Sequence, residues 1–242
     1  MKALLLNSGI GRRMGALTRN KPKCLVELQG QETILYRQVR ALLENGIKEI
    51  IITTGPFEEQ IKDYLKKLFP HLRIHYILNP LYDSTNYIYS MLLAKDLMDD
   101  DIILMHGDLV FEDTLLEKTI QSSYSNTVLV NPKAPLPEKD FKARVEKGQV
   151  TEISIHIFDD NCFFLIPLYK LSRELCKKWL GEMEEFNKQG KLNVYAEEAL
   201  NNILLDHSLF PIYFNQELCS EIDDLRDLET VKKLIVSQTG GQ

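Results

Sequence analysis

Hydrophobic residues recur in two alternating patterns along the first half of the chain. Short apolar runs, which are typical of buried strands, are separated by stretches in which apolar residues return every three or four positions, as they do in helices. The predicted strands cover residues 3–6, 49–54, 74–78 and 102–105, and the predicted helices cover residues 34–45, 58–68 and 87–98. Because strands and helices alternate, we expect a mostly parallel sheet with helices on both faces.

The second half of the chain has a different pattern. Short strand-like segments follow one another with tight turns such as Lys147-Gly148, and a long helix is expected from residue 172 to about residue 188. The four segments lie at residues 127–131, 143–146, 150–157 and 162–166. Sequential strands with tight turns indicate a small antiparallel insertion in an otherwise Rossmann-like, mixed α/β fold.

The length of the chain suits a single domain. It has 242 residues, of which 44% are hydrophobic, and an open α/β domain of this size can bury one sizeable core. Neither a linker of low complexity nor an internal repeat divides the sequence. We therefore expect one domain over residues 1–236, followed by a disordered polar tail at residues 237–242.

Charge and cysteine usage narrow the class of protein. A net charge of −6 disfavours a nucleic-acid or anionic-membrane partner, and no apolar run approaches the roughly 20 residues of a membrane span. The N-terminal apolar run is too short for a signal peptide. The cysteines at 24, 162, 176 and 219 lack the spacing of a metal site or a disulfide framework, so we expect buried thiols in a cytoplasmic protein.

Candidate chemistry is concentrated directly after the first strand. Gly9 and Gly11 leave backbone N–H groups open to the close approach of an anion. Arg12, Arg13 and Lys23 add positive charge suited to phosphate oxygens. The spacing matches neither the dinucleotide fingerprint nor the P-loop. A phosphate-binding loop is therefore predicted, and a basic surface turn is the alternative.

This segment resembles the signature of the sugar-phosphate nucleotidyltransferase family, whose members move a nucleoside monophosphate from an NTP to a phosphorylated acceptor. The residues that carry the resemblance are Gly9, Gly11, Arg13, Met14, Thr18, Pro22, Lys23 and Leu25. The likeness runs through nearly the whole chain and implies a nucleotide-binding half at residues 1–125 and an acceptor-binding half at residues 126–224. Asn7-Ser8 stand where the family usually has two alanines, and Ala16 stands where it usually has proline.

The resemblance also implies a metal site. It places a metal-binding aspartate at Asp108, directly after the strand at 102–105, and a second one at Asp223, and Mg²⁺ favours such oxygen ligands. An aspartate in either position could instead form a turn or cap a helix. We assign Asp223 to the metal and Asp224 to the cap of a helix that begins at about residue 225.

The same resemblance implies the roles of the first loop. An acceptor phosphate oxygen would attack the α-phosphorus of the NTP, with Lys23 stabilising charge at the α-phosphate and Arg13 holding the leaving pyrophosphate. These two residues are the predicted catalytic residues. The predicted nucleotide-binding residues are Asn7, Ser8, Gly9, Gly11, Arg12, Arg13, Thr85, Asn86, Ser90 and Gly107.

Residues 79–91 resemble the branch of the family that uses CTP and small phosphorylated amines, although Thr85 or Asn86 could simply cap the following helix. Lys142 matches a position that reaches the acceptor phosphate, with an exposed strand lysine or a register error in favour of Arg144 as alternatives. Tyr195, Glu197 and Glu198 could hold an ammonium group, or the two acids could serve a helix dipole.

The function expected from this resemblance is CMP transfer from CTP to phosphocholine, phosphoethanolamine, 2-aminoethylphosphonate or phosphoglutamine. The product would be a CDP-activated precursor for decorating a surface glycan, a capsule or a lipid. A UTP- or dTTP-dependent sugar-1-phosphate enzyme and a non-catalytic nucleotide-binding homologue are the alternatives. The sequence leaves the oligomeric state open, a homodimer included.

Overall fold

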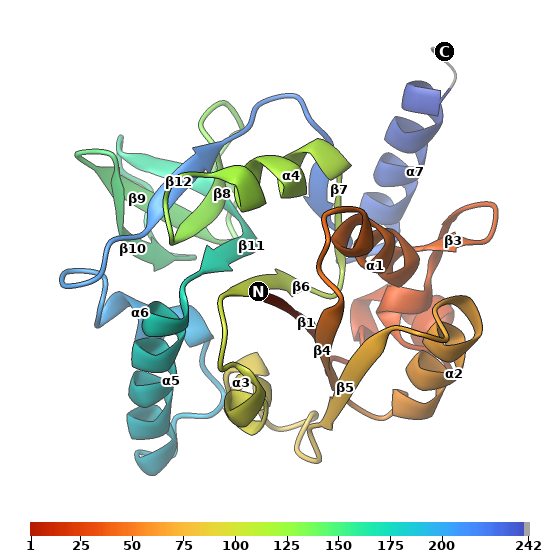
Figure 1. The fold of residues 1–242 in the computed structure, drawn as a ribbon. Coiled ribbons are helices and arrows are strands. Elements are labelled where there is room, and N and C mark those ends of the chain that lie inside the picture. The colour runs from red at the N-terminus through yellow and green to blue at the C-terminus, as the bar shows by residue number, and fades with distance from the viewer. Residues whose placement is uncertain (240–242) are drawn as a thin grey trace.

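Four parallel strands form the centre of the molecule. The computed structural model describes residues 1–239 of the chain. The central strands are β1 (Lys2–Asn7), β4 (Glu49–Thr54), β5 (Arg73–Leu78) and β6 (Ile102–His106). They lie in the order β5-β4-β1-β6, so the first strand is enclosed on both sides (Figure 1). This is the predicted Rossmann-like arrangement.

Strand β11 (Cys162–Leu171) joins the two halves of the chain. Its last residues pair antiparallel with β6, and its first residues pair antiparallel with β9 (Lys142–Glu146). β8 (Thr127–Asn131) pairs antiparallel with β11 on both sides of a register shift. The remaining strands are β10 (Gln149–Ser154), beside β9, and β12 (Phe210–Tyr213), beside β8. The expected antiparallel strands, together with β12, which was not predicted and runs parallel to β8, extend the central sheet to nine strands. Pro167 lies at the register shift within β11, where a missing N–H is tolerated.

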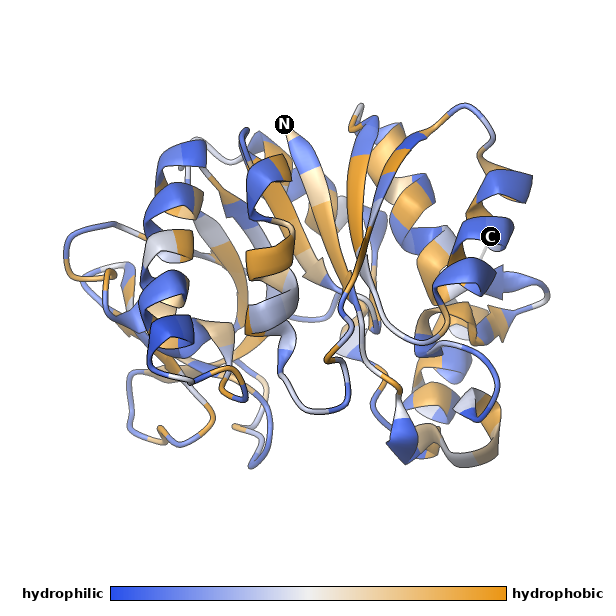
Figure 2. Ribbon diagram, turned by 90° about the horizontal axis from the view of Figure 1, so that it is seen from below, coloured by the Kyte–Doolittle hydropathy of each residue, from blue (hydrophilic) through white to orange (hydrophobic). Residues whose placement is uncertain are grey.

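Helices cover both faces of the sheet, as the alternating pattern predicts. One face carries α1 (Ile34–Glu44), α2 (Glu58–Leu68) and α4 (Asp113–Gln121), and the other carries α3 (Tyr87–Leu93), α5 (Arg173–Lys188) and α6 (Ala196–Asn201). Along β1, Ala3 and Leu5 pack toward α1, whereas Leu4 and Leu6 pack toward α3. Figure 2 shows the apolar helix faces turned inward. The helix predicted at 87–98 ends early and is followed by a 3-10 turn at Lys95–Leu97.

The C-terminal segment packs against the first loop of the chain. Helix α7 (Leu225–Thr239) contacts the hairpin of β2 (Glu27–Gln29) and β3 (Glu32–Thr33), and β13 (Cys219–Glu221) pairs with β7 (Leu109–Phe111) (Figure 1). These elements share a small apolar cluster with Met14. Residues 237–239 of the expected tail are helical, and residues 240–242 lie outside the described part of the chain.

The four cysteines are free thiols, and Cys24, Cys162 and Cys176 are buried as expected. Cys219 is partly buried. Among residues 1–239, none of the helices combines the length and the apolar character that crossing a membrane requires.

Candidate active site

Three segments converge at the carboxyl ends of the central strands. Asn7 is in register with Thr54, and Leu6 is in register with His106, so the loops that follow β1, β4 and β6 leave the sheet at one edge. In open α/β sheets this edge is where ligands bind. A cavity of about 660 Å³ lies here and meets a smaller one of about 290 Å³. Both are lined by Leu6, Gly9, Asn86, Tyr87, His106 and Asp108.

The first loop is closed by its own side chains. Thr18 donates a hydrogen bond to the carbonyl of Gly11 (2.7 Å), which holds together the short 3-10 helix Arg12–Thr18. Gly11 has φ +69°, and a Cβ there would lie 3.2 Å from Cβ of Lys23 in the next 3-10 helix, Lys23–Leu25. A glycine therefore satisfies both the backbone conformation and the close packing of this loop.

Lys23 lies between two carboxylates. Its Nζ is 2.6 Å from Oδ2 of Asp108 and 3.0 Å from Oδ1 of Asp223, and the Lys23 side chain is only 13% exposed. The more exposed Arg13 also pairs with Asp223, at 2.7 Å. Burial opposes the charge on Lys23, but Asp108 and Asp223 outweigh it and raise its pKa. The predicted catalytic and metal-binding residues thus form one charged group.

The aspartates have the oxygen atoms that a divalent cation needs. Oδ1 of Asp108 is buried and accepts no hydrogen bond within residues 1–239. Burial would raise the pKa of Asp108, but the charges of Lys23 and His106 overcome this and lower it. Asp224 instead accepts hydrogen bonds from the backbone N–H groups of Arg226 and Asp227, and so caps α7 as expected. Asp108 and Asp223 therefore fit Mg²⁺, which favours carboxylate oxygens.

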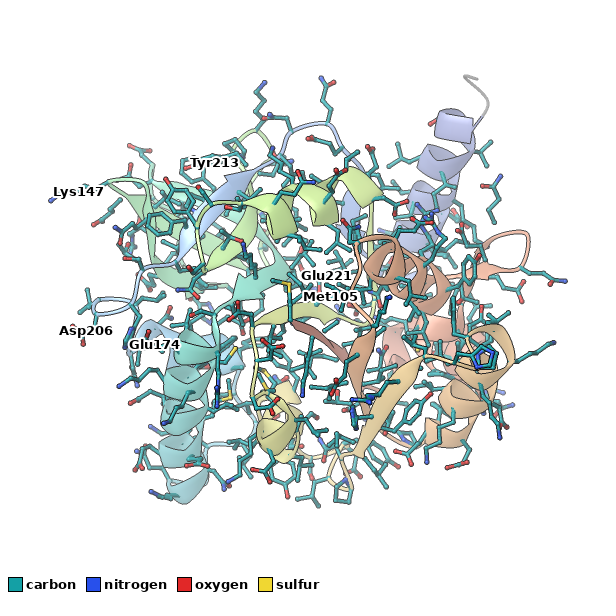
Figure 3. The ribbon with its side chains drawn as sticks, viewed as in Figure 1. Met105, Lys147, Glu174, Asp206, Tyr213 and Glu221 are labelled. Atoms are coloured by element: carbon teal, nitrogen blue, oxygen red, sulfur yellow. The ribbon has the colours of Figure 1, made fainter. Side chains whose placement is uncertain are left out.

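A histidine–glutamate pair stands beside this charged group. Nδ1 of His106 lies 2.8 Å from Oε1 of Glu221, and Figure 3 labels Glu221 near Met105, the residue before His106 in β6. Burial disfavours the imidazolium, but Glu221, followed by Asp108 and Glu197, raises the pKa of His106 to about 9. Possible ligand atoms of His106, Asp108 and Glu221 all lie within 4.8 Å of one another.

Sequence reasoning did not assign the His106–Glu221 pair. Two signals were available: His106 ends β6 immediately before Gly107-Asp108, and Glu221 precedes Asp223 by two positions. Residues two apart share a face of an extended chain. The contact between the two side chains, 115 positions apart, depends on the pairing of β13 with β7.

The smaller cavity gathers the predicted residues Ser8, Thr85 and Ser90 with Asn79. Their side chains form one hydrogen-bonded chain: Ser90 donates to Ser8 (3.0 Å), and Nδ2 of Asn79 lies within bonding distance of Ser90 (3.0 Å) and Thr85 (3.1 Å). Asn86 caps α3 and lines both cavities. The helix-cap alternative and a binding role are thus compatible for Asn86.

The remaining predicted nucleotide-binding residues, which are Asn7, Gly9, Gly11, Arg12, Arg13 and Gly107, line the larger cavity. Gly107 is also needed inside the fold, because a Cβ there would lie 1.9 Å from Oδ1 of Asn7 and 2.7 Å from the carbonyl of Leu6. The end of β1 in the same chain therefore packs closely against Gly107 and leaves no room for a side chain there.

The structure does not bring three of the four predicted acceptor residues to the larger cavity. Glu197 is buried and accepts hydrogen bonds from Tyr169 (2.9 Å) and Tyr87, and Glu198 is exposed on the other side of α6. Nζ of Lys142 is buried on the carbonyls of Pro137 (2.7 Å) and Ile155 (2.5 Å). The helical turn at Glu197 and the strand face at Lys142 direct these side chains into the protein. The alternative, Arg144, pairs with Glu152 and Asp159.

Tyr195 does line the larger cavity, and it belongs to an aromatic wall. Its ring lies 4.9 Å from that of Phe141 and 6.2 Å from that of Tyr87, between ring centroids. Asp140 lies at the rim of the same cavity, and burial, followed by the charges of Asp223 and Asp227, raises its pKa. Aromatic faces beside carboxylates suit a cationic group.

The sequence of this chain is similar to those of several known nucleotidyltransferases. The chain is 31% identical over 137 residues to CTP:phosphoglutamine cytidylyltransferase of Campylobacter jejuni, covering 54% of this chain and 53% of that protein. It is 32% identical over 124 residues to choline-phosphate cytidylyltransferase of Streptococcus pneumoniae, covering 51% and 52%. A third relative, CMP-5'-(3-aminopropyl)phosphonate synthase of Streptomyces rubellomurinus, is 30% identical over 137 residues, covering 56% and 22%. The matches thus span about half the length of these relatives or less.

A solved structure of CTP:phosphocholine cytidylyltransferase from Streptococcus pneumoniae (LicC) has the same fold, with a TM-score of 0.75 at 20% identity over 97% of this chain and 98% of that one. The inositol-1-phosphate CTP transferase of T. maritima gives a TM-score of 0.78, also at 20% identity, over 99% and 96%. The model of the MobA-like NTP transferase domain matches residues 3–238. The chain therefore belongs to the MobA-like NTP transferase domain family, a nucleotidyltransferase family that includes cytidylyltransferases.

Proposed function

We propose that this protein is a Mg²⁺-dependent cytidylyltransferase that transfers CMP from CTP to a small phosphorylated amine or amino acid. The observation that carries the proposal is the position of Lys23 between Asp108 and Asp223, beside the glycine loop. A module that only binds phosphate needs the basic loop, but it does not need two carboxylates from opposite ends of the chain.

The residues suggest a direct transfer. A phosphate or phosphonate oxygen of the acceptor attacks the α-phosphorus of CTP, the bond from that phosphorus to the bridging α–β oxygen breaks, and pyrophosphate leaves with the electron pair. Asp108 and Asp223 would hold Mg²⁺, which when bound supplies charge neutralisation for phosphate groups. Lys23 stabilises charge at the α-phosphate, and Arg13, which is 64% exposed at the mouth of the cavity, holds the pyrophosphate.

The two cavities support separate binding of two substrates. The smaller cavity is lined by the hydroxyl groups of Ser8 and Thr85, whose oxygens can accept from the polar edge of a base or ribose, and Asn79 holds these side chains in place. The larger cavity offers the aromatic wall of Tyr195, Phe141 and Tyr87 for an acceptor with an amino group. The names of the three relatives favour CTP and acceptors of this kind.

Pyrophosphate release tests the proposal. The purified protein is incubated with Mg²⁺, each of the four NTPs in turn, and phosphocholine, phosphoethanolamine, 2-aminoethylphosphonate, phosphoglutamine or a hexose 1-phosphate. Release with CTP and an amine-bearing acceptor is the expected result. Release only with UTP or dTTP and a sugar phosphate would overturn the substrate assignment, and no release with any pair would contradict catalysis.

Two aspartate variants link any activity to this site. Asp108→Ala should abolish turnover, because it removes the buried carboxylate beside Lys23. Asp206→Ala is the matched control, since Asp206 is exposed and lies at the left edge of the molecule in Figure 3, whereas Glu221 lies near the centre. Equal activity of the two variants would contradict the assignment.

A further inference from the structure

Asn79 fixes the direction of the hydrogen bonds in the smaller cavity. The residue is only 1% exposed, and its Oδ1 accepts a hydrogen bond from the backbone N–H of Leu81 (2.8 Å). Because a backbone N–H can only donate, this contact identifies the oxygen end of the amide. The other end, Nδ2, donates to Oγ of Ser90 (3.0 Å) and to Oγ1 of Thr85 (3.1 Å). Both hydroxyl groups therefore act as acceptors toward Asn79.

Thr85 has an acceptor but no donor left for a ligand. Its hydroxyl proton goes to the carbonyl of Leu81 (2.7 Å), since a carbonyl oxygen can only accept. One of the two lone pairs on Oγ1 is taken by Asn79, and no group within residues 1–239 uses the other. Thr85 lines the smaller cavity, and its hydrogen bond to Leu81 is exposed, so Oγ1 is open to a ligand. The side chain that caps α3 is Asn86, so capping does not occupy Thr85.

An oxygen that can only accept distinguishes an amino group from a carbonyl group. Cytosine carries an amino group at ring position 4, where uracil carries a carbonyl oxygen. We infer that Oγ1 of Thr85 is a specificity-determining contact, which accepts a hydrogen bond from the 4-amino group of the base and so selects CTP over UTP. The inference rests on the proposed function and names the atom by which the site recognises its nucleotide. Asn79 acts as a positioning residue, since its amide fixes the direction of the bonds to Thr85.

Substitutions at two neighbouring positions test this contact. Thr85→Val keeps the shape of the side chain but removes the hydroxyl group, and should lower the CTP-to-UTP ratio of kcat/KM at least about tenfold, through a raised KM for CTP. Thr85→Ser restores the hydroxyl group and should keep the preference. Ser84→Ala is the matched control, because Ser84 is exposed, donates to the same Leu81 carbonyl (3.4 Å) and lines neither cavity. An unchanged ratio in Ser84→Ala separates base recognition from closure of the loop.

A nucleotide analogue tests the same contact in the parent protein. The 5′-triphosphate of pyrimidin-2-one riboside is CTP without the 4-amino group. The parent should use it at least about tenfold less well than CTP in kcat/KM, because a site built to hydrogen-bond a group discriminates against an analogue that lacks it. Thr85→Val should use the two nucleotides about equally, with an unchanged KM for the acceptor. The measurement on the parent decides the inference even where Thr85→Val is too unstable to assay.

The outcomes distinguish this inference from the proposed function. Pyrophosphate release with the same CTP-to-UTP ratio in Thr85→Val as in the parent, or an equal loss in Ser84→Ala, would overturn the inference and leave the proposed function standing. Equal use of CTP and the pyrimidin-2-one analogue by the parent would do the same. Release with UTP but not with CTP would overturn both. If no nucleotide supports release, the proposed function fails, and calorimetry decides the inference: tighter binding of CTP than of UTP, lost in Thr85→Val, supports it, and equal or absent binding overturns it.

Discussion

Lys23 and Asp223 are 200 positions apart in sequence, yet Nζ of Lys23 lies 3.0 Å from Oδ1 of Asp223. Asp108, from the middle of the chain, accepts a second hydrogen bond from the same ammonium group at 2.6 Å. One lysine thus offsets the repulsion between two carboxylates that come from different parts of the fold. Removing that charge should expose the repulsion, and a divalent cation should relieve it.

Lys23→Met should therefore destabilise the protein by about 1–3 kcal/mol in the absence of divalent ions, because the partly buried carboxylate of Asp108 loses the charged partner of its Oδ2. Mg²⁺ should raise the Tm of this variant more than that of the parent, since a ligand that binds only the folded state stabilises it. Thermal unfolding with increasing MgCl₂ measures both effects. Lys178→Met, at an exposed position of α5, is the control. An identical Mg²⁺ response in the parent and Lys23→Met would contradict the prediction.

Substitutions at the adjacent residues Asp223 and Asp224 should affect different properties of the protein, turnover for the first and stability for the second. Asp223→Asn should lower kcat about 100-fold or more, because it removes a charge that holds the phosphate-binding machinery together. Asp224→Ala should cost about 1 kcal/mol of stability through loss of the α7 cap, with turnover largely kept. Parallel urea titrations and pyrophosphate assays separate the two. The reverse pattern would assign the metal to Asp224.

The alternation of strands and helices was enough to predict the central sheet and the helices on its two faces. Three of the four predicted strands of the first half, β1, β4 and β6, are largely buried, so their apolar runs are easy to recognise, whereas the edge strand β5 is only partly buried. β7 and β13 were not predicted, because three-residue strands carry too few residues to show a period. These two strands bring Glu221 to His106.

The charged group was predictable for a different reason. The family resemblance assigned the roles of Lys23 and Asp108, and the topology agreed with it, because segments that follow parallel strands meet at one edge of the sheet. The orientation of Glu197 and Lys142 was not predictable from the sequence. A shift of one position along the helix or the strand is enough to move such a side chain from the cavity into the core. The tyrosines that bond Glu197 lie 28 and 110 positions away in the sequence, and the Ile155 carbonyl that bonds Lys142 lies 13 positions away, so no local pattern indicates these contacts.

The buried position of Glu197 predicts that it acts on stability more than on acceptor binding. Glu197→Gln replaces an acceptor of two tyrosine hydroxyl hydrogen bonds by an amide, and should cost about 1–3 kcal/mol of unfolding free energy. Glu198→Gln, its exposed neighbour, should stay within about 0.5 kcal/mol of the parent. Urea unfolding checks the pair. A raised KM for the acceptor in Glu198→Gln, with unchanged stability, would restore the ammonium-binding role expected for these residues.

Gly107 gives the sharpest steric prediction in the site. A Cβ at this position would lie 1.9 Å from Oδ1 of Asn7, so Gly107→Ala should destabilise the protein by about 1–3 kcal/mol, as overpacking of a tight interior does. Combining it with Asn7→Ala should recover part of the loss, but not all, because the carbonyl of Leu6 remains 2.7 Å away. Gly181→Ala in α5 is the matched control: it meets nothing within 4 Å and should stabilise the protein by about 0.5–1 kcal/mol. Thermal and urea unfolding of the four variants measure these terms, and strictly additive effects of Gly107→Ala and Asn7→Ala would show that the two side chains do not collide.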